Sequence, residues 1–257
     1  MKLGISLTER CYRMCWFCYA MSHPTYPTEM DFDELSNFIL ELRRLKHPPL
    51  LCFGGGEPFE YRKIIDLINL LERLRYPYSI TSNLMKIPCN LGEIMRYGWL
   101  WGSIHYPSET QSVINILKST GKKNVGVNIM VMRDYLPVIY DVVEEVIKAG
   151  LRYIITFFKA VGRGVINKKQ ELTFEEKKEL IVNLCRRYGG VYTDSCQGLS
   201  GDKKCTCGVS WFTITVDKVL KPNSFYPSGV KLERLTLAEF LKAKDKIPKQ
   251  VHLQEVK

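Results

Sequence analysis

The sequence lacks any long apolar segment, and no stretch approaches the roughly 20 consecutive apolar residues that a helix needs to cross a bilayer. The opening MKLGISLTER contains one lysine and a short apolar run broken by Glu9 and Arg10, which is too short for the core of a secretory signal peptide. Internal repeats, low-complexity segments and Gly/Ser linkers are also absent. These absences predict a cytoplasmic globular protein without a membrane partner.

Concentrated positive charge is lacking as well, although the net charge is +10. The 37 lysines and arginines are spread in ones and twos, as in Arg43-Arg44 and Lys122-Lys123. Proteins that bind nucleic acid instead carry dense basic blocks or stripes. The excess charge is therefore interpreted as a solvated surface, and nucleic acid is not expected as a partner.

What the chain does contain is a regular alternation of short apolar segments with amphipathic ones. With 257 residues and 46% hydrophobic content, it can bury a substantial core. Three helix-start signals are clear, Asp31 with Glu34, Thr173 with Glu176 and Thr236 with Glu239, each an N-cap followed three positions later by glutamate. Strands are expected over residues 3–7, 50–53, 78–81, 100–104, 125–132 and 153–158, and helices between them over 61–74, 91–97, 108–119 and from 136.

This alternation predicts an α/β fold. Strands joined by helices favour right-handed crossovers and a parallel sheet, with functional groups gathered at the carboxyl ends of the strands. Six such units predict a partial (β/α)6 TIM-like barrel over residues 1–188. The following residues, 189–257, are rich in Gly, Cys and Lys and predict a small irregular cysteine-containing C-terminal extension, ending in a helix over 235–244.

Cysteine is plentiful and clustered. The total of nine is odd, and in a reducing compartment clustered cysteines indicate metal or redox chemistry rather than disulfides. Cys11, Cys15 and Cys18 form a C-x3-C-x2-C pattern just after the first expected strand. The spacing also fits one face of a buried helix, and a zinc site would need a fourth ligand that is not nearby. A 4Fe-4S cluster takes one thiolate per iron, so three cysteines would leave one iron open to a substrate or cosubstrate.

A second motif, GGGEP, occupies residues 54–58 at the end of the second expected strand. Glycines allow a ligand to approach the backbone closely, and Glu57 can accept hydrogen bonds from an ammonium group. A glycine run after a strand is also commonly a plain turn. Because parallel strands bring their carboxyl ends to one edge of the sheet, this motif is expected to lie beside the cysteine loop.

Together the two motifs resemble the signature of the radical S-adenosylmethionine (SAM) superfamily, which pairs C-x3-C-x2-C after the first strand with GGE after the second. The resemblance covers residues 1 to about 165 and implies a 4Fe-4S cluster whose open iron is chelated by the methionine group of SAM. Further polar contacts to SAM are implied at the ends of the later strands. The residues implied are Cys11, Cys15 and Cys18 for the cluster, and Phe17, Gly55, Gly56, Glu57, Ser82, Asn83, Ser103, Asn128 and Arg163 for SAM.

The resemblance also implies the chemistry. A one-electron reductant of the ferredoxin or flavodoxin type reduces the cluster, SAM is cleaved, and a 5′-deoxyadenosyl radical abstracts a hydrogen atom from the substrate. His105 and Tyr106, just past the fourth expected strand, are candidates to face the substrate.

The stretch CTCGVSWFTITVDKVLKP (residues 205–222) resembles the SPASM or twitch extension that carries auxiliary clusters in some members of this superfamily. Lys218 stands where that pattern has a glycine, and Asn223 stands where it has a cysteine. The extension is therefore interpreted as truncated or degenerate. It has room for at most one auxiliary iron-sulfur cluster, on Cys196, Cys205 and Cys207, with zinc or no metal as the alternatives.

Substrate identity stays open between classes. A peptide or protein is favoured, because SPASM-like members of the superfamily often modify peptides. A small heterocycle or nucleotide is the alternative for an enzyme, and a non-catalytic iron-sulfur or redox-sensing protein is the alternative class. The glutamate of GGGEP favours an enzyme, since a sensor has no need for a group that binds methionine.

Overall fold

A computed structural model describes residues 1–193 and 206–249 of the chain, and Cys196 and Cys205 therefore lie outside the described residues. One ten-stranded sheet organises it, in the order β10-β9-β8-β1-β2-β3-β4-β5-β6-β7. The strands are β1 (Lys2–Ser6), β2 (Leu50–Gly54), β3 (Tyr78–Ser82), β4 (Trp99–Ile104), β5 (Val125–Val131), β6 (Arg152–Phe157), β7 (Tyr192–Thr193), β8 (Trp211–Ile214), β9 (Val219–Lys221) and β10 (Val230–Lys231).

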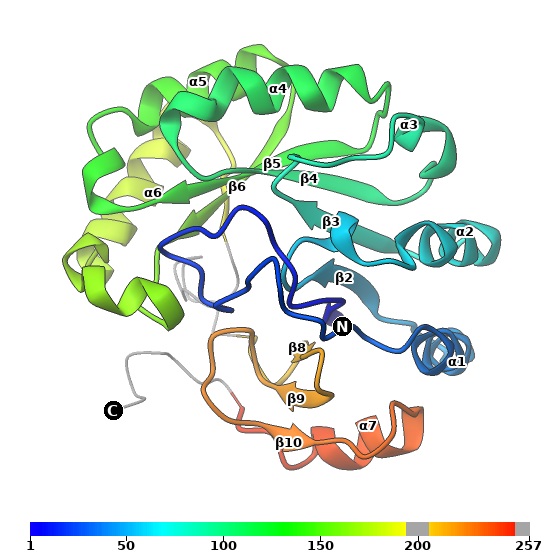
Figure 1. The fold of residues 1–257 in the computed structure, drawn as a ribbon. Coiled ribbons are helices and arrows are strands. Elements are labelled where there is room, and N and C mark those ends of the chain that lie inside the picture. Colours follow the sequence, from blue (N-terminus) through cyan, green and yellow to red (C-terminus); the bar gives the residue numbers. More distant parts are fainter. Residues whose placement is uncertain (194–205, 250–257) are drawn as a thin grey trace.

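The sheet is parallel from β8 through β1 to β7, and only β9 and β10 run antiparallel to their neighbours. It curves into a partial barrel with helices around its outer side (Figure 1), which confirms the predicted fold class. The α-helices are α1 (Phe32–Arg43), α2 (Ile64–Leu74), α3 (Leu91–Ile94), α4 (Thr110–Ser119), α5 (Ile139–Lys148), α6 (Phe174–Tyr188) and α7 (Leu237–Lys244). Short 3-10 helices are η1 (Pro58–Glu60), η2 (Pro107–Glu109), η3 (Arg133–Tyr135) and η4 (Gly162–Gln170).

The core lies between the sheet and the helices. Leu3 and Ile5 of β1 are buried and pair in register with Leu51 and Phe53 of β2, so that one side of each strand joins the same apolar layer. Each such side chain contributes roughly 1.5–3 kcal/mol when it is fully buried. The alternate positions of the strands face the concave side of the sheet, and several of them carry small or polar residues, such as Gly4, Ser103 and Asn128.

The structure confirms the helix starts that the sequence predicts from a polar N-cap. The Asp31 side chain accepts a hydrogen bond from the backbone N–H of Glu34, and Thr173 and Glu176 cap each other's backbone N–H groups. Two helix starts that the sequence predicts near a proline are too early. The helix expected from residue 61 is α2, which begins at Ile64 because Pro58 begins the short helix η1 before it. The helix expected from 136 is α5, which begins at Ile139 because η3 precedes it.

The C-terminal extension continues the barrel sheet. β8 pairs with β1 from Lys2↔Trp211 to Ile5↔Ile214, and β9 returns antiparallel beside β8. In the turn between them Lys218 has a φ of +61°, a left-handed conformation that favours glycine. The local geometry at Lys218 is therefore that of a glycine turn, although a lysine occupies it.

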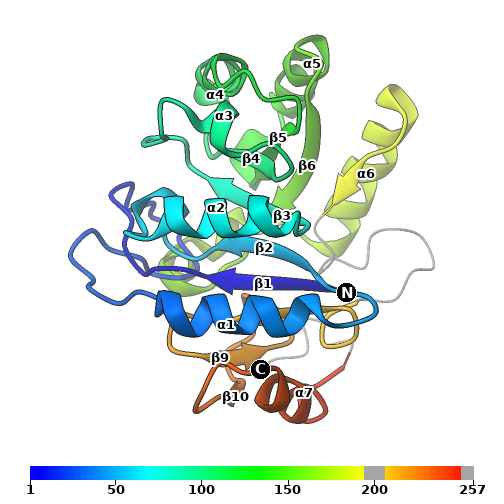
Figure 2. The ribbon, with the colours of Figure 1, turned by 90° about the vertical axis from the view of Figure 1, so that its right-hand side faces the viewer.

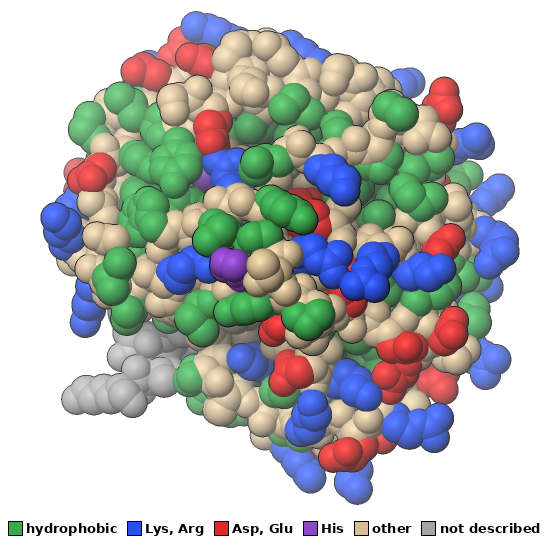
Figure 3. Space-filling model, in the orientation of Figure 1, with side chains coloured by type: hydrophobic (Ala, Val, Ile, Leu, Met, Phe, Trp, Pro, Cys, Tyr) green, Lys and Arg blue, Asp and Glu red, His purple; other side chains and the backbone are tan. Residues whose placement is uncertain are grey.

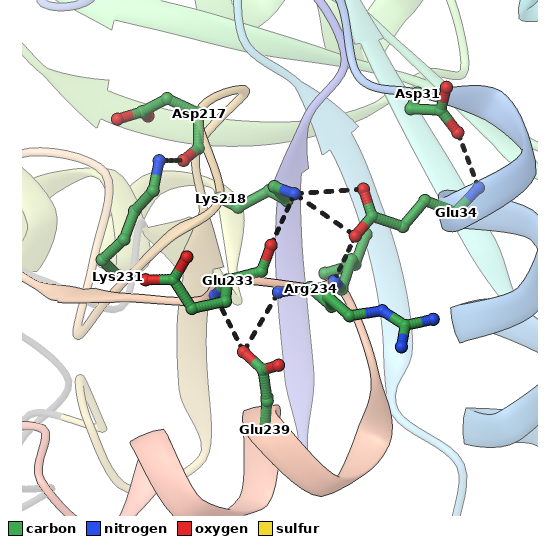
Figure 4. A network of polar contacts seen from close by, with 9 residues as sticks. Asp31, Glu34, Asp217, Lys218, Lys231, Glu233, Arg234 and Glu239 are labelled. Atoms are coloured by element: carbon green, nitrogen blue, oxygen red, sulfur yellow. Dashed lines mark hydrogen bonds and ion pairs between the residues drawn. The ribbon is translucent and has the colours of Figure 1, made fainter.

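Carboxylates of α1 attach the end of the extension to the barrel (Figure 4). Glu34 accepts hydrogen bonds from Lys218 Nζ at 3.3 Å and from the backbone N–H of Leu235 at 2.6 Å. Two turns further along α1, Glu41 accepts from the backbone N–H of Leu237, the first residue of α7. These contacts hold α7 beside α1 (Figure 2) and explain why Glu34 does not close a reciprocal capping box with Asp31.

Candidate functional site

The cysteine loop, residues 7–31, follows β1 and crosses the open centre of the partial barrel (Figure 1). Residues 7–31 contain no helix, which excludes the interpretation of the three cysteines as a helical core stripe. Cys11, Cys15 and Cys18 are all free thiols of intermediate exposure. The pKa of the Cys15 thiol is raised to about 11, mainly by burial, with Arg13 lowering it and the charges of Cys11 and Cys18 raising it.

The glycine run packs against the start of this loop. The backbone N–H of Gly56 donates to Thr8 O at 2.7 Å, and that of Glu57 donates to Arg10 O at 2.8 Å. A Cβ on Gly56 would lie 2.1 Å from Arg10 O, and Gly55 adopts a φ of +108°. The close approach for which these glycines are needed is thus made by the protein's own cysteine loop.

Glu57 links the ends of β2 and β3 and is 1% exposed. Its carboxylate accepts hydrogen bonds from Ser82 Oγ and from the backbone N–H of Asn83, both at 2.8 Å, and from the N–H of Phe59 at 3.1 Å. Burial raises its pKa to about 7, although these three donors oppose the shift. The carboxylate is therefore preorganised but lacks a cationic partner among the described residues.

Asn83 connects this carboxylate to the cysteine loop, because its Nδ2 donates to Cys11 Sγ at 3.6 Å. The sequence had placed Glu57, Ser82, Asn83 and Cys11 in one site, and the structure brings these four into one continuous network. Ser103 and Asn128 lie opposite each other on β4 and β5, on the concave side of the sheet. No hydrogen bond joins them to the Glu57 network in the described part of the chain.

Arg163 contacts the cysteine loop directly. Its Nε donates to Cys15 O and its Nη1 to Ser22 O, both at 2.9 Å, and its backbone N–H donates to Cys18 O at 3.1 Å. Gly162 before it has a φ of +57°, and a Cβ there would lie 2.4 Å from Tyr19 O. The loop after β6 therefore holds the part of the cysteine loop from Cys15 to Ser22, whereas the glycine run holds its start.

We expect replacement of Arg163 by glutamine to loosen the cysteine loop without unfolding the barrel. Partners that orient metal ligands typically contribute about 10- to 100-fold to metal affinity. Iron loss from the reconstituted protein to a chelator should therefore be at least about tenfold faster. Arg152→Gln is the matched control. Arg152 is the first residue of β6, at the end of the strand away from the Arg163 loop, and its guanidinium lies over the Trp99 ring. Equal rates in the two variants would show that the Arg163 contacts do not hold the loop.

Aromatic side chains surround the last two cysteines. Phe17 is buried and packs against Trp16, and its ring centroid lies 5.4 Å from that of His105 and 5.8 Å from that of Tyr106. Burial lowers the pKa of His105 to about 3, so this histidine is neutral. Cys15, Trp16 and Tyr106 pack against the small apolar cluster to which Phe17 belongs, so one side of the site is apolar.

The C-terminal extension also reaches the cysteine loop. The ring of Phe225 lies 4.8 Å from that of Tyr19, and Lys159 Nζ lies 3.7 Å from the Phe225 centroid. Cys207 and Asn223 of this region are both fully buried, and Asn223 Nδ2 has no hydrogen-bond partner among residues 1–193 and 206–249. These contacts were not predicted, since nothing in the sequence marks Phe225 as a neighbour of Tyr19.

The donor chemistry suits an iron-sulfur cluster. Within the described residues, no group of three or more His, Cys, Asp or Glu side chains is placed to hold a metal ion. In a 4Fe-4S cluster each thiolate binds its own iron, so the sulfur atoms need not converge on one point. Three soft thiol donors on one loop, clamped on both sides by backbone contacts, fit such a group.

The chain was also compared with known families and proteins. A family model described as the Radical SAM superfamily matches residues 5–164. No curated protein sequence matches the chain. No helix in the described part of the chain is long and apolar enough to span a membrane.

Several solved structures are similar. Streptococcus suis SuiB bound to S-adenosylmethionine aligns with a TM-score of 0.73 and 16% identity, covering 95% of this chain and 64% of SuiB. SuiB bound to the precursor peptide SuiA gives 0.67 and 15%, covering 86% and 59%. The structure of anSMEcpe with bound AdoMet and Cp18Cys peptide gives 0.68 and 14%, covering 96% and 82%. The chain thus spans less than two thirds of SuiB, and at these identities the likeness concerns the fold.

Proposed function

Because the chain belongs to the radical SAM superfamily, whose enzymes use a 4Fe-4S cluster and SAM, we propose that it modifies a peptide or protein and holds its cluster through Cys11, Cys15 and Cys18. The observation that carries the placement of the site is the hydrogen bond from Asn83 Nδ2 to Cys11 Sγ. Through it Cys11 adjoins the carboxylate of Glu57, so that a cluster and the methionine group of SAM would lie side by side.

The proposed roles follow from the contacts. When bound, the cluster supplies one electron that cleaves SAM and generates the radical that abstracts a substrate hydrogen. Glu57 would accept hydrogen bonds from the ammonium group of SAM. Ser82 and Asn83 hold the Glu57 carboxylate in place for this contact. Phe17 and its aromatic neighbours exclude water. Ser103, Asn128, Gly55 and Gly56 complete the proposed SAM site, and Arg163 supports it through the cysteine loop.

A peptide substrate is supported by two of the similar structures, SuiB with the precursor peptide SuiA and anSMEcpe with the Cp18Cys peptide. We propose that residues 1–188 form the radical SAM barrel and that 189–257 form a degenerate SPASM/twitch-like extension. The hairpin of β8 and β9, with its left-handed turn at Lys218, supports this assignment. Contact of Phe225 with Tyr19 would place the extension at the wall of the substrate site.

The proposed reductant is an acidic one-electron donor of the ferredoxin or flavodoxin type. On the face that carries the cysteine loop, hydrophobic side chains lie among lysines and arginines (Figure 3), and Tyr12, Met14 and Met21 of the loop are exposed. The net charge of +10 would attract such a donor.

The substrate class is tested with the reconstituted full chain under anaerobic conditions. A synthetic library of linear peptides should raise the rate of 5′-deoxyadenosine formation from SAM by about tenfold over the substrate-free rate. Mass spectrometry of the peptides should then show a changed product. A mixture of nucleosides serves as the comparison. Stimulation by nucleosides but not by peptides would overturn the peptide assignment in favour of a small heterocyclic substrate.

A further inference from the structure

We propose that Arg13 raises the reduction potential of the cluster on the cysteine loop, and that Glu109 positions Arg13 for this task. The inference rests on the proposed function, because it assumes that Cys15 is a cluster ligand. Arg13 is one of the three residues between the first two cysteines, so it moves with the loop that carries them. Neither residue was singled out by the sequence motifs.

The position of Arg13 is set from outside the loop. Its Nη2 forms an ion pair with Glu109 Oε1, across 96 residues of sequence, and the side chains are only 13% and 28% exposed. The guanidinium also lies 5.8 Å from the centroid of Tyr106. A partly buried pair of this kind is screened by salt much less than a surface pair.

Glu109 is itself held by the connection between β4 and α4. Its second oxygen, Oε2, accepts the backbone N–H groups of His105 and Tyr106, both at 3.3 Å. One carboxylate therefore joins the end of β4, the η2 turn and the cysteine loop. This arrangement aligns the guanidinium and leaves its remaining donors available.

Arg13 and Cys15 line the same cavity, together with Asn83, Tyr106 and Glu109. Burial raises the pKa of the Cys15 thiol and the positive charge of Arg13 lowers it, which agrees with this placement. Arg13 Nε is buried and has no hydrogen-bond partner in the described part of the chain. On the other side of the loop the charges of Glu57 and Glu60 act on Cys11 in the opposite sense. Arg13 is thus a cation placed at one specific sulfur.

A cation beside Cys15 affects the reduction of the cluster more than it affects the binding of the cluster to the protein. Reduction moves one electron from an external donor to the cluster, with no bond broken and no proton taken up, and so adds negative charge to a group already bound by three thiolates. Cluster potentials depend on nearby charge and on hydrogen bonds to sulfur. A guanidinium in the same cavity as Cys15 therefore stabilises the reduced form and eases electron entry.

The test is an anaerobic redox titration of the reconstituted full chain, with dithionite as reductant and viologen mediators, followed by electron paramagnetic resonance of the reduced cluster. For Arg13→Gln we expect the ratio of reduced to oxidised cluster at a given potential to fall about tenfold, equivalent to a midpoint about 59 mV lower. Glu109→Gln keeps the hydrogen-bond acceptor but removes a negative charge, so the ratio should rise. Arg13→Lys should lie closer to wild type than Arg13→Gln.

Arg62→Gln is the matched control, because Arg62 is exposed and pairs with Glu29, which lies after the three cysteines in the loop. Its potential should equal that of wild type. Equal potentials in wild type, Arg13→Gln and Glu109→Gln would overturn the inference alone, whereas a wild-type protein without a 4Fe-4S signal would overturn the proposed function as well. If Arg13→Gln fails to retain the cluster, the double variant Arg13→Gln/Glu109→Gln decides, because it leaves no unpaired charge at this place. Its midpoint should lie below that of Glu109→Gln, and equal midpoints would overturn the inference.

Discussion

Replacement of Gly56 by alanine is expected to weaken SAM binding by about 100-fold and to destabilise the fold by about 1–3 kcal/mol. The new Cβ would lie 2.1 Å from Arg10 O and 2.8 Å from Arg10 C, both backbone atoms that no rotamer change can move. Hydrogen bonds from Gly56 to Thr8 and from Glu57 to Arg10 hold the two segments together. Relief of the clash must therefore displace either Glu57 or the start of the cysteine loop. Isothermal titration with SAM and thermal unfolding measure the two effects.

Gly54→Ala is the matched control for Gly56→Ala, because it lies in the same glycine run. A Cβ on Gly54 would meet no atom within 4 Å, and its φ lies outside the left-handed region. Its unfolding temperature should therefore stay near that of wild type. Similar losses of stability in both variants would mean that the contact between GGGEP and the cysteine loop is not what requires glycine here.

Replacement of Glu57 by glutamine is expected to weaken SAM binding by roughly 10- to 100-fold, since a hydrogen bond to a charged group contributes roughly 1.5–3 kcal/mol. Glutamine keeps the shape and one acceptor oxygen for Ser82, so the fold should be retained. Glu57→Ala is a poorer test because it would leave the donors of Phe59, Ser82 and Asn83 without partners. A Glu57→Gln variant with wild-type SAM affinity would remove Glu57 from the cofactor site.

The same carboxyl predicts a pH dependence. Burial raises the pKa of Glu57 from 4.5 to about 7 in the folded chain, so its contribution to stability is full below about pH 4.5 and is lost as the pH rises through 7. Over this window the free energy of unfolding of wild type should fall relative to Glu57→Gln by up to about 3 kcal/mol without SAM. SAM binding has the opposite dependence, because its ammonium group requires the carboxylate, and affinity should weaken below about pH 7. Free energies of unfolding that change in parallel with pH in wild type and Glu57→Gln would contradict the first expectation, and a SAM affinity that does not weaken below about pH 7 would contradict the second.

Local patterns were enough to predict the barrel and the meeting of its two motifs. The alternation of apolar strands with capped helices determines the parallel sheet, and parallel strands bring the residues that follow them to one edge. The cysteine pattern and GGGEP each follow a strand, so their meeting could be predicted without knowing any distance. The family resemblance, not the local pattern, named Ser82, Asn83, Ser103 and Asn128, and the structure places Ser82 at the end of β3 and Ser103 beside Asn128 on adjacent strands.

Contacts made by long side chains could not be predicted in this way. The family resemblance implied that Arg163 contacts SAM. In the structure its side chain donates to the carbonyls of Cys15 and Ser22, a contact that depends on how the loop after β6 turns at Gly162. The pairing of Arg13 with Glu109 joins two connections 96 residues apart and leaves no periodic signal in the sequence. Addition of β8 to the free edge of β1 was also not foreseen, because a strand of four residues among Gly and Lys has little pattern of its own.

The central claim is that the cysteine loop holds a cluster that cleaves SAM reductively. The most direct measurement is anaerobic: the full chain is reconstituted with iron and sulfide, SAM and dithionite are added, and 5′-deoxyadenosine is quantified by chromatography. We predict that wild type forms 5′-deoxyadenosine and that Cys15→Ala forms none above the level without protein. Absence of 5′-deoxyadenosine from a wild-type protein with a spectroscopically confirmed 4Fe-4S cluster, with and without peptide, would contradict the account and favour a non-catalytic iron-sulfur protein.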